Sequence, residues 1–163
     1  MERVADAVAT ARAAGVTIGF VRVALTDADF DALPEGSRVG QRFAGNRDAM
    51  HADSPSTAVH DRVAPREGDV VVRKTRVGAF STTDLADQLA ARGVDTVVLS
   101  GISTSGVVLS TVRDAADRDL RIVVLEDGCA DANPVVHDML LSSVFPSQAD
   151  LVRVADLEAL LAR

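Results

Sequence analysis

The chain has 163 residues, a formal net charge of −7 at pH 7 and 47% hydrophobic residues. This length suits one domain with a single sizeable core, and the excess of acidic residues argues against nucleic acid or an anionic membrane as a partner. We therefore predict a single domain over residues 1–163 that has neither nucleic acid nor a membrane among its partners.

Cysteine usage and hydropathy indicate the compartment. Cys129 is the only cysteine, which excludes a disulfide framework within the chain and suits the reducing cytoplasm. No apolar run approaches the roughly 18 residues of a membrane span, and the first residues open a helical pattern rather than a signal peptide. The sequence predicts a cytoplasmic protein.

The first half of the chain is predicted to form a helix, a strand, a long loop and a second strand. A helix is expected over residues 2–14, because Val4, Val8 and Ala11 form one apolar face and Gly15 follows as a stop. Strands are expected over residues 16–25 and 69–74. Residues 26–68 are rich in Asp, Gly, Pro and Ser, and we predict an irregular segment there that is functional or forms an interface.

The second half alternates in the same way. Thr82 or Thr83 together with Asp84 is expected to cap a helix that ends at Gly93. Buried strands are expected over residues 96–99 and 120–125. Helices are expected from Val107 and from Pro134, followed by a short edge strand at 151–154 and a closing helix at 156–162. This alternation predicts an α/β fold.

Residues 95–111, DTVVLSGISTSGVVLST, form the central stretch of the sequence. The β-branched run 96–99 is typical of a strand buried on both faces of a parallel sheet. A turn of small residues then leads from Gly101 into the helix expected at Val107. Ligands of open α/β sheets bind beyond the carboxyl ends of strands, near the free N–H groups of helix N-termini. The turn is therefore either an anion or oxyanion site or an ordinary tight connection.

The segment 97–115, VVLSGISTSGVVLSTVRDA, resembles the nucleophile turn of the isochorismatase-like (cysteine hydrolase) family, whose pattern is a strand and then G-x-x-T-x-x-C-V-x-x-T. Gly101, Thr104, Val108 and Thr111 fit this pattern. ARAAGVTIGFVRV (11–23) resembles the family's first helix and second strand, and VVRKTRVGAFSTTDLADQL (71–89) resembles its lysine region. The resemblance implies a doubly wound (Rossmann-like), mostly parallel sheet with helices on both faces, in three αβα layers.

The same resemblance assigns positions in a site. Lys74 matches the family's catalytic lysine, and the resemblance places it in the pocket, whereas its position alone favours a solvated lysine at the end of a strand. The family's cysteine falls on Val107, which has no nucleophilic atom. The Ile102–Ser103 peptide is expected to be cis. The expected substrate-binding residues are Ser103, Thr104, Gly106, Arg76 and Phe80. Of these, Arg76 could instead pair with the acidic surface, and Phe80 could be core.

One family element has no counterpart in this sequence. Family members open with an apolar strand that lies in the middle of the sheet and ends in the Asp general base, before the helix that begins here at Glu2. Without it, two strands would carry unpaired backbone groups, each costing on the order of 1–3 kcal/mol if buried. We expect a longer native chain, closure of the two flanking strands, or another chain in the gap, and favour the first because the remaining pattern is intact.

Three further groups of side chains could be functional. His51, Asp53 and His60 would need to converge to hold a metal, their spacing is not a known ligand pattern, and we predict no metal and no cofactor. Cys129 follows Glu126 and Asp127, and such neighbouring carboxylates raise a thiol pKa, so we interpret it as structural rather than as a relocated nucleophile. His137 is expected at a surface or an interface.

Two functions remain open. The first is an isochorismatase-like hydrolase that acts on or binds a small molecule, which could be anionic, without cysteine chemistry. Acid catalysis needs no nucleophile, but it does need an acidic group that protonates the substrate. The second is a catalytically inactive scaffold or pocket protein of the same fold. The resemblance also implies a homo-oligomer, dimer or tetramer.

Overall fold

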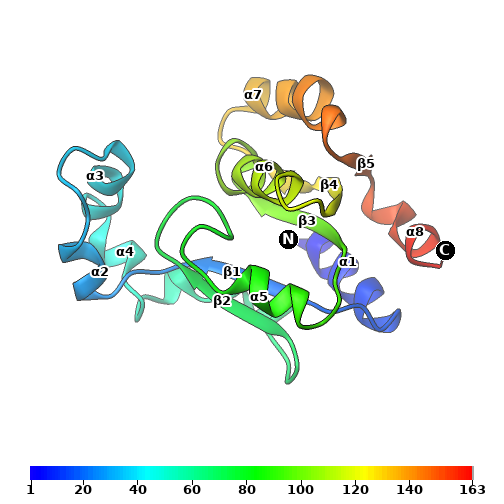
Figure 1. Cartoon of the computed structure of the whole chain (residues 1–163), viewed down its shortest axis with the longest axis horizontal. Coiled ribbons are helices and arrows are strands. Elements are labelled where there is room, and N and C mark those ends of the chain that lie inside the picture. The colour runs from blue at the N-terminus through cyan, green and yellow to red at the C-terminus, as the bar shows by residue number, and fades with distance from the viewer. Residues whose placement is uncertain (163) are drawn as a thin grey trace.

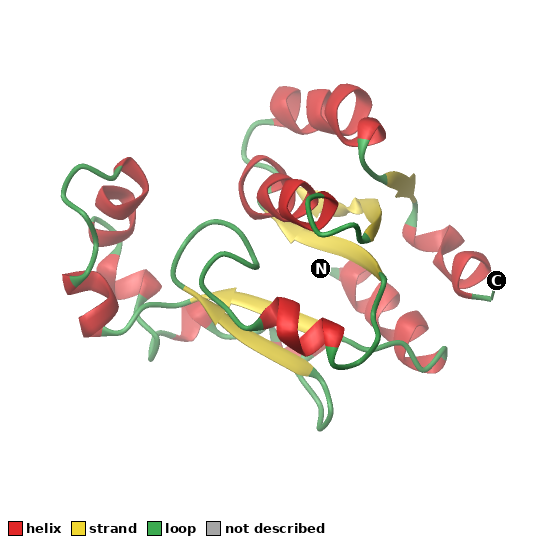
Figure 2. Ribbon diagram, viewed as in Figure 1, coloured by secondary structure: helices red, strands yellow, loops and turns green. Residues whose placement is uncertain are grey.

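Five strands form two separate parallel sheets in the computed structural model, which describes residues 1–162 (Figure 2). β1 (Gly19–Val23) pairs with β2 (Val70–Lys74). β3 (Thr96–Ile102) pairs with β4 (Arg121–Ala130), which pairs with β5 (Asp150–Val152). The arrows of β1, β2 and β3 point the same way in Figure 2. Hence the predicted parallel α/β character is confirmed, but the single predicted sheet is divided.

The five predicted helices lie close to their expected positions, with ends that differ by a few residues (Figure 1), and three further helices lie in the segment 26–68. α1 opens the chain, and the last turns of the chain form another helix beside it. In chain order they are α1 (Glu2–Ala13), α2 (Asp27–Asp31), α3 (Arg38–Ala44), α4 (Arg47–Met50), α5 (Leu85–Ala90), α6 (Leu109–Ala116), α7 (Pro134–Met139) and α8 (Leu157–Leu161).

The segment 26–68 is not irregular throughout, contrary to the prediction, because it contains α2, α3 and α4. Local capping explains the first of these helices. The Thr26 hydroxyl accepts from the Asp29 amide, and the Asp29 carboxylate accepts from the Thr26 amide, so both free donors are satisfied by neighbours. Helices of four to seven residues show too little apolar periodicity to be seen in the sequence.

Two boundaries around the central turn also differ from the prediction. β4 does not end at Leu125 but continues through Glu126–Ala130, after a shift in register opposite Leu99 and Gly101. The helical segment after β3 begins at Thr104 rather than Val107, as one π-helical turn over Thr104–Val108 that leads into α6. The acidic and glycine residues after Leu125 are typical of a loop, but Cys129 and Ala130 pair with Gly101 and Ile102 of β3 and so extend the strand.

Helices cover both faces of β3 and complete the three layers. Val97 and Leu99 pack against a core that includes Leu85 of α5 and Val112 of α6. Val98, between them, packs against a second core that includes Ala7 of α1 and Leu157 of α8. Since successive side chains of a strand point to opposite faces, α5 and α6 lie on one face of β3 and α1 and α8 on the other. In the described residues, no helix is long and apolar enough to cross a bilayer.

A gap separates β1 from β3, and no hydrogen-bonded strand joins the two sheets within residues 1–162. The two flanking strands therefore do not close up, which was one of the three expected arrangements. The gap changes the burial of β3: Val97, Val98 and Leu99 are half-buried, whereas a strand buried on both faces was predicted. By contrast, the neighbouring β4 has Ile122–Leu125 almost completely buried.

Candidate functional site

Lys74 lies at the carboxyl end of β2, and its side chain is folded into the protein. It is 6% exposed and is the only lysine of the sequence. Its ammonium group donates to the backbone oxygens of Arg76 and Val77, both at 2.9 Å. Burial lowers the pKa of Lys74 to about 8. No ion pair reaches Lys74 among residues 1–162, so the solvated strand-end lysine is not what the structure shows.

The loop that follows Lys74 lies against the first turn of α6. A Cβ atom on Gly78 would lie 3.6 Å from the Cβ atom of Ser110. The loop therefore lies next to the start of α6, which follows β3 and its turn. It brings the carboxyl ends of β2 and β3 to the same side of the protein, even though the two strands belong to different sheets. The lysine region and the turn at 103–108 thus lie on the same edge of the fold, as the order of the elements predicts.

The turn after β3 is held by its own backbone and by one carboxylate. The Ile102–Ser103 peptide is cis, as expected. The Ser103 carbonyl accepts from the amides of Gly106 and Val108, and a Cβ atom on Gly106 would lie 2.6 Å from the Ser103 hydroxyl oxygen, so a larger residue there would displace this hydroxyl. The Ser105 amide donates to Asp131 Oδ2 at 2.7 Å.

Asp131 is a site residue that the sequence analysis missed. It follows β4, and its pKa is lowered to about 2 by hydrogen bonds. The largest contribution comes from the Ser105 hydroxyl, followed by the amides of Ser105 and Asn133. The carboxylate is therefore ionised over the whole physiological range and acts as an acceptor for the turn. Only the placement of a polar residue at a strand end could have pointed to it.

His137, which was expected at a surface or an interface, is half-buried. Its Nδ1 atom lies 2.8 Å from the hydroxyl oxygen of Thr104, which is completely buried. His137 is half-buried on α7, so this helix is tied to the start of the turn. The contact joins residues 33 positions apart, which is why no local pattern revealed it.

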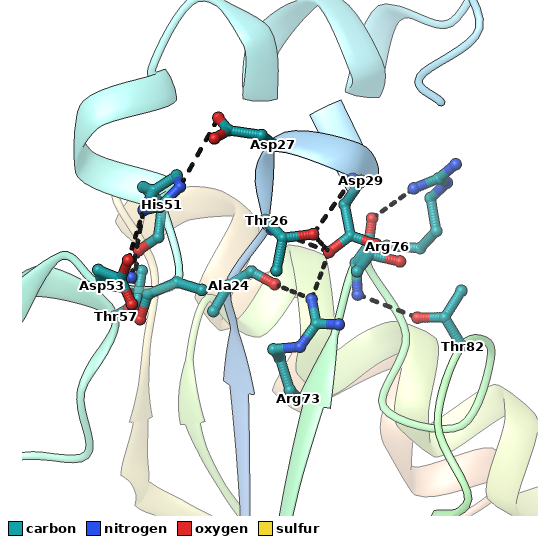
Figure 3. Close-up of polar contacts among 12 residues, drawn as sticks. Ala24, Thr26, Asp27, Asp29, His51, Asp53, Thr57, Arg73, Arg76 and Thr82 are labelled. Atoms are coloured by element: carbon teal, nitrogen blue, oxygen red, sulfur yellow. Dashed lines mark hydrogen bonds and ion pairs between the residues drawn. The ribbon is translucent and has the colours of Figure 1, made fainter. Parts of the chain in front are cut away.

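The remaining predicted positions are distributed between core and surface. Val107 is half-buried and packs against the larger core. Phe80 belongs to that core, is 5% exposed, and has the Arg118 guanidinium 4.9 Å above its ring. Arg76 donates to the neighbouring Thr75 carbonyl (Figure 3) and makes no ion pair in the described part of the chain, so the alternative of pairing with the acidic surface is not seen.

Cys129 has the properties of a structural cysteine. Its side chain is buried in the larger core, and burial, with a smaller contribution from the Asp127 charge, raises the pKa of its thiol to about 11. The thiol is thus protonated at neutral pH, which is unfavourable for a nucleophile. The carboxylate effect expected from the sequence is present, but burial is the larger cause.

A second polar cluster surrounds His51, at some distance along the chain from the turn (Figure 3). Its Nε2 atom lies 3.8 Å from Asp27 and its Nδ1 atom 3.7 Å from Asp53, while its ring stacks on Phe30. His60 does not join this cluster, because its ring nitrogen accepts from the Arg62 amide. Within residues 1–162, no three or more His, Cys, Asp or Glu side chains are grouped as metal ligands.

These features define an α/β protein with a turn-and-lysine site, and the comparisons define its family. The Isochorismatase domain matches residues 1–156, so the chain belongs to the isochorismatase family.

Among curated proteins, maleamate amidohydrolase of Pseudomonas putida is 36% identical over 66% of this chain and 50% of its own length. A ureidoacrylate amidohydrolase of Methylobacterium radiotolerans is 34% identical over 87% of this chain and 59% of its own length. The chain thus spans only about half to three fifths of these relatives. An isochorismatase family protein of Desulfovibrio vulgaris has a solved structure that is 28% identical and covers 98% of this chain and 83% of its own, with a TM-score of 0.85.

Proposed function

We propose that the edge formed by Lys74 and the turn 103–108 binds a small acyl compound that carries a negative charge. The observation that carries this proposal is a buried ammonium group with no carboxylate partner in the described residues. A buried charge is costly unless it is paired. The two carbonyl oxygens that Lys74 contacts are dipoles and not counter-ions, so an anionic ligand would relieve this cost.

The reaction, if the bound molecule is hydrolysed, proceeds without an acyl-enzyme. Val107 has no atom that could attack a carbonyl carbon, and the Cys129 thiol stays protonated. Lys74 has a pKa of about 8 and is mostly charged at pH 7, so it can polarise an acyl oxygen or deliver a proton to the leaving group while water attacks. The names of the relatives support an amide as the substrate.

A catalytically inactive binding protein is the second candidate, and a specific observation favours it. The Lys74 ammonium already donates to two carbonyl oxygens, and Val107, at the position of the family's nucleophile, is a half-buried apolar side chain packed against the core. In this version the same edge binds the anion and no bond is broken.

One experiment separates the two candidates. Maleamate, ureidoacrylate, nicotinamide and isochorismate are each incubated with the chain, and both the thermal shift and product release are measured. A ligand-induced shift that is lost in Lys74→Met but kept in Arg92→Met, which removes an exposed charge on another loop, supports binding at Lys74. Product release in addition supports the hydrolase, whereas a shift without product supports the binding protein. No shift with any compound contradicts both.

We also propose that the chain forms a homo-oligomer, because apolar side chains are exposed beside the turn. Ile102 is 73% and Val135 74% exposed, and Met139, on the same helix as Val135, is 46% exposed. Val135 and Met139 lie on α7, which contacts the turn through His137. Light scattering with Val135→Asp, expected to shift the chain toward monomer, tests this; a monomeric unmodified chain would contradict it.

A further inference from the structure

The side chain of Thr104 is completely buried at the start of the turn 103–108, and a single contact satisfies its hydroxyl group. Its Oγ1 atom lies 2.8 Å from Nδ1 of His137, and the hydroxyl has no other hydrogen-bond partner in the part of the chain that the structure describes. A buried hydroxyl hydrogen needs an acceptor. Nδ1 supplies one only in a neutral ring whose proton is on Nε2. The contact therefore selects this form of His137.

His137 is held by a helix whose start is fixed by its own sequence. The side-chain oxygen of Asn133 caps α7, because it accepts from the Val135 amide at 3.0 Å. Pro134 occupies the first helical turn, where its missing N–H group needs no partner. His137 lies one turn further along, on a helix that lies beside α6 (Figure 1). Its ring therefore approaches the turn from a helix rather than from a loop.

A second contact from the same segment acts on the next residue of the turn. Asp131 Oδ2 accepts from the Ser105 amide at 2.7 Å, and Oδ1 of the same carboxylate accepts from the Asn133 amide at 3.1 Å. The segment 131–137 therefore holds two successive residues of the turn, Thr104 through its side chain and Ser105 through its amide. Two neighbouring contacts fix the direction of the backbone, whereas one would leave it free to rotate.

The turn itself has few groups that could hold it. Residues 103–106 are Ser, Thr, Ser and Gly, which bury little apolar area. The helical segment Thr104–Val108 is a single π turn, a form that is rare and occurs frequently at functional sites. The amides of Gly106 and Val108 both donate to the same carbonyl oxygen, that of Ser103. Contacts from outside the turn therefore help to determine its arrangement.

The turn leads directly into α6, which the loop after Lys74 contacts. A Cβ atom on Gly78 of that loop would lie 3.6 Å from the Cβ atom of Ser110, in the first turn of α6. A displaced turn would therefore change the surface against which the loop after Lys74 packs. His137 contacts Thr104 and makes no hydrogen bond to Lys74 within residues 1–162, so its effect on Lys74 passes through the turn.

We propose that His137 is a positioning residue, whose neutral ring acts through Thr104 to hold the turn 103–108 in the arrangement that faces the loop after Lys74. Loss of this contact lets the turn move and thereby weakens the binding of an anion at Lys74. The effect on the anion rests on the proposed function, whereas the hold on the turn does not.

Two substitutions of His137 separate the acceptor atom from the bulk of the ring. Asparagine places an oxygen acceptor close to the position of Nδ1, whereas leucine has no acceptor. His137→Leu should speed amide hydrogen exchange at Ser105 and Gly106 about tenfold and raise the dissociation constant of maleamate about tenfold, because a buried hydrogen bond is lost. His137→Asn should keep both quantities within about threefold of the unsubstituted chain. His60→Leu, which changes an exposed histidine on another loop, is the control and should alter neither.

Thr104→Val removes the same hydrogen bond from the other partner and replaces His137→Leu if that variant does not fold. Because His137 acts through Thr104, adding His137→Leu to Thr104→Val should speed exchange at Ser105 no further. Ring ¹⁵N NMR of the unsubstituted chain should find the His137 proton on Nε2.

Unchanged exchange at Ser105 in His137→Leu would overturn the proposal, as would equal effects of leucine and asparagine or a ring proton on Nδ1. Faster exchange with unchanged maleamate binding would overturn the link between His137 and Lys74, although the binding itself would uphold the proposed function. If the unsubstituted chain binds no maleamate, the proposed function is contradicted, and the exchange measurement, which needs no ligand, still decides the role of His137.

Discussion

Lys74 is the residue with the clearest chemical identity in the chain. As the only lysine, it gives a single signal in any lysine-selective measurement. Its position at the carboxyl end of a strand, the ligand-binding edge of a parallel sheet, could be predicted from the sequence, whereas its assignment to a pocket rests on the family resemblance. That its ammonium folds inward onto two carbonyl oxygens could not be predicted, since this depends on the course of the loop after β2.

The lowered pKa of Lys74 predicts how stability changes with pH. The folded pKa is about 8 and the ordinary value is 10.5, so between these pH values the unfolded chain binds more protons than the folded one. The free energy of unfolding contributed by this group therefore rises as pH increases from 8 to 10.5. Urea unfolding measures the free energy of unfolding of the chain and of Lys74→Met. The difference between the two free energies should change between pH 8 and 10.5 and should be constant below pH 7. A pH-independent difference would contradict the buried, shifted lysine.

Thr111 and Thr104 form a matched pair of buried threonines. The Thr111 hydroxyl has no partner in the described residues, whereas the Thr104 hydroxyl pairs with His137. Thr111→Val should therefore raise the free energy of unfolding and Thr104→Val should lower it, each by about 1 kcal/mol. Chemical denaturation of the two variants measures both signs. Destabilisation by Thr111→Val would show that its hydroxyl has a partner.

At the scale of elements, the turn 103–108 is held in place by β4 and α7 as much as by its own sequence. Asp131 and His137 reach it from residues that follow the next strand. The small residues of the turn predict a tight connection between strand and helix, and this is confirmed. The two polar contacts could not be predicted, because they require knowledge of where β4 ends, and its extension to Ala130 was not apparent from composition.

Asp131→Asn should loosen this turn. The substitution removes the charge that accepts from the Ser105 amide, so amide exchange at Ser105 and Gly106 should become faster and the melting temperature should fall at pH 7. Because the folded pKa is about 2, against an ordinary value of 3.8, the stabilisation by this carboxylate is present above pH 4 and is lost as pH falls toward 2. Equal melting temperatures of the two proteins at pH 7 would contradict the role of Asp131.

At the scale of the molecule, the principal difference from expectation is the division of the sheet. The alternation of helices and strands predicts the layers, and both faces of β3 are covered as expected. Which strands are hydrogen-bonded neighbours is not encoded in local periodicity, so the separation of β1 from β3 could be anticipated only through the family resemblance. Because of this separation, Val97, Val98 and Leu99 are half-buried rather than buried.

The measurement that tests the central claim most directly follows the Lys74 side chain by NMR, with ¹³C-labelled lysine, during a titration with maleamate. We predict that the ligand shifts this single signal and raises the pKa of Lys74 above about 8, because a nearby anion favours the charged form, while the intact mass of the protein stays unchanged. An unchanged lysine signal at saturating ligand would contradict binding at Lys74, and a stable mass increase equal to the acyl group would contradict chemistry without a covalent intermediate.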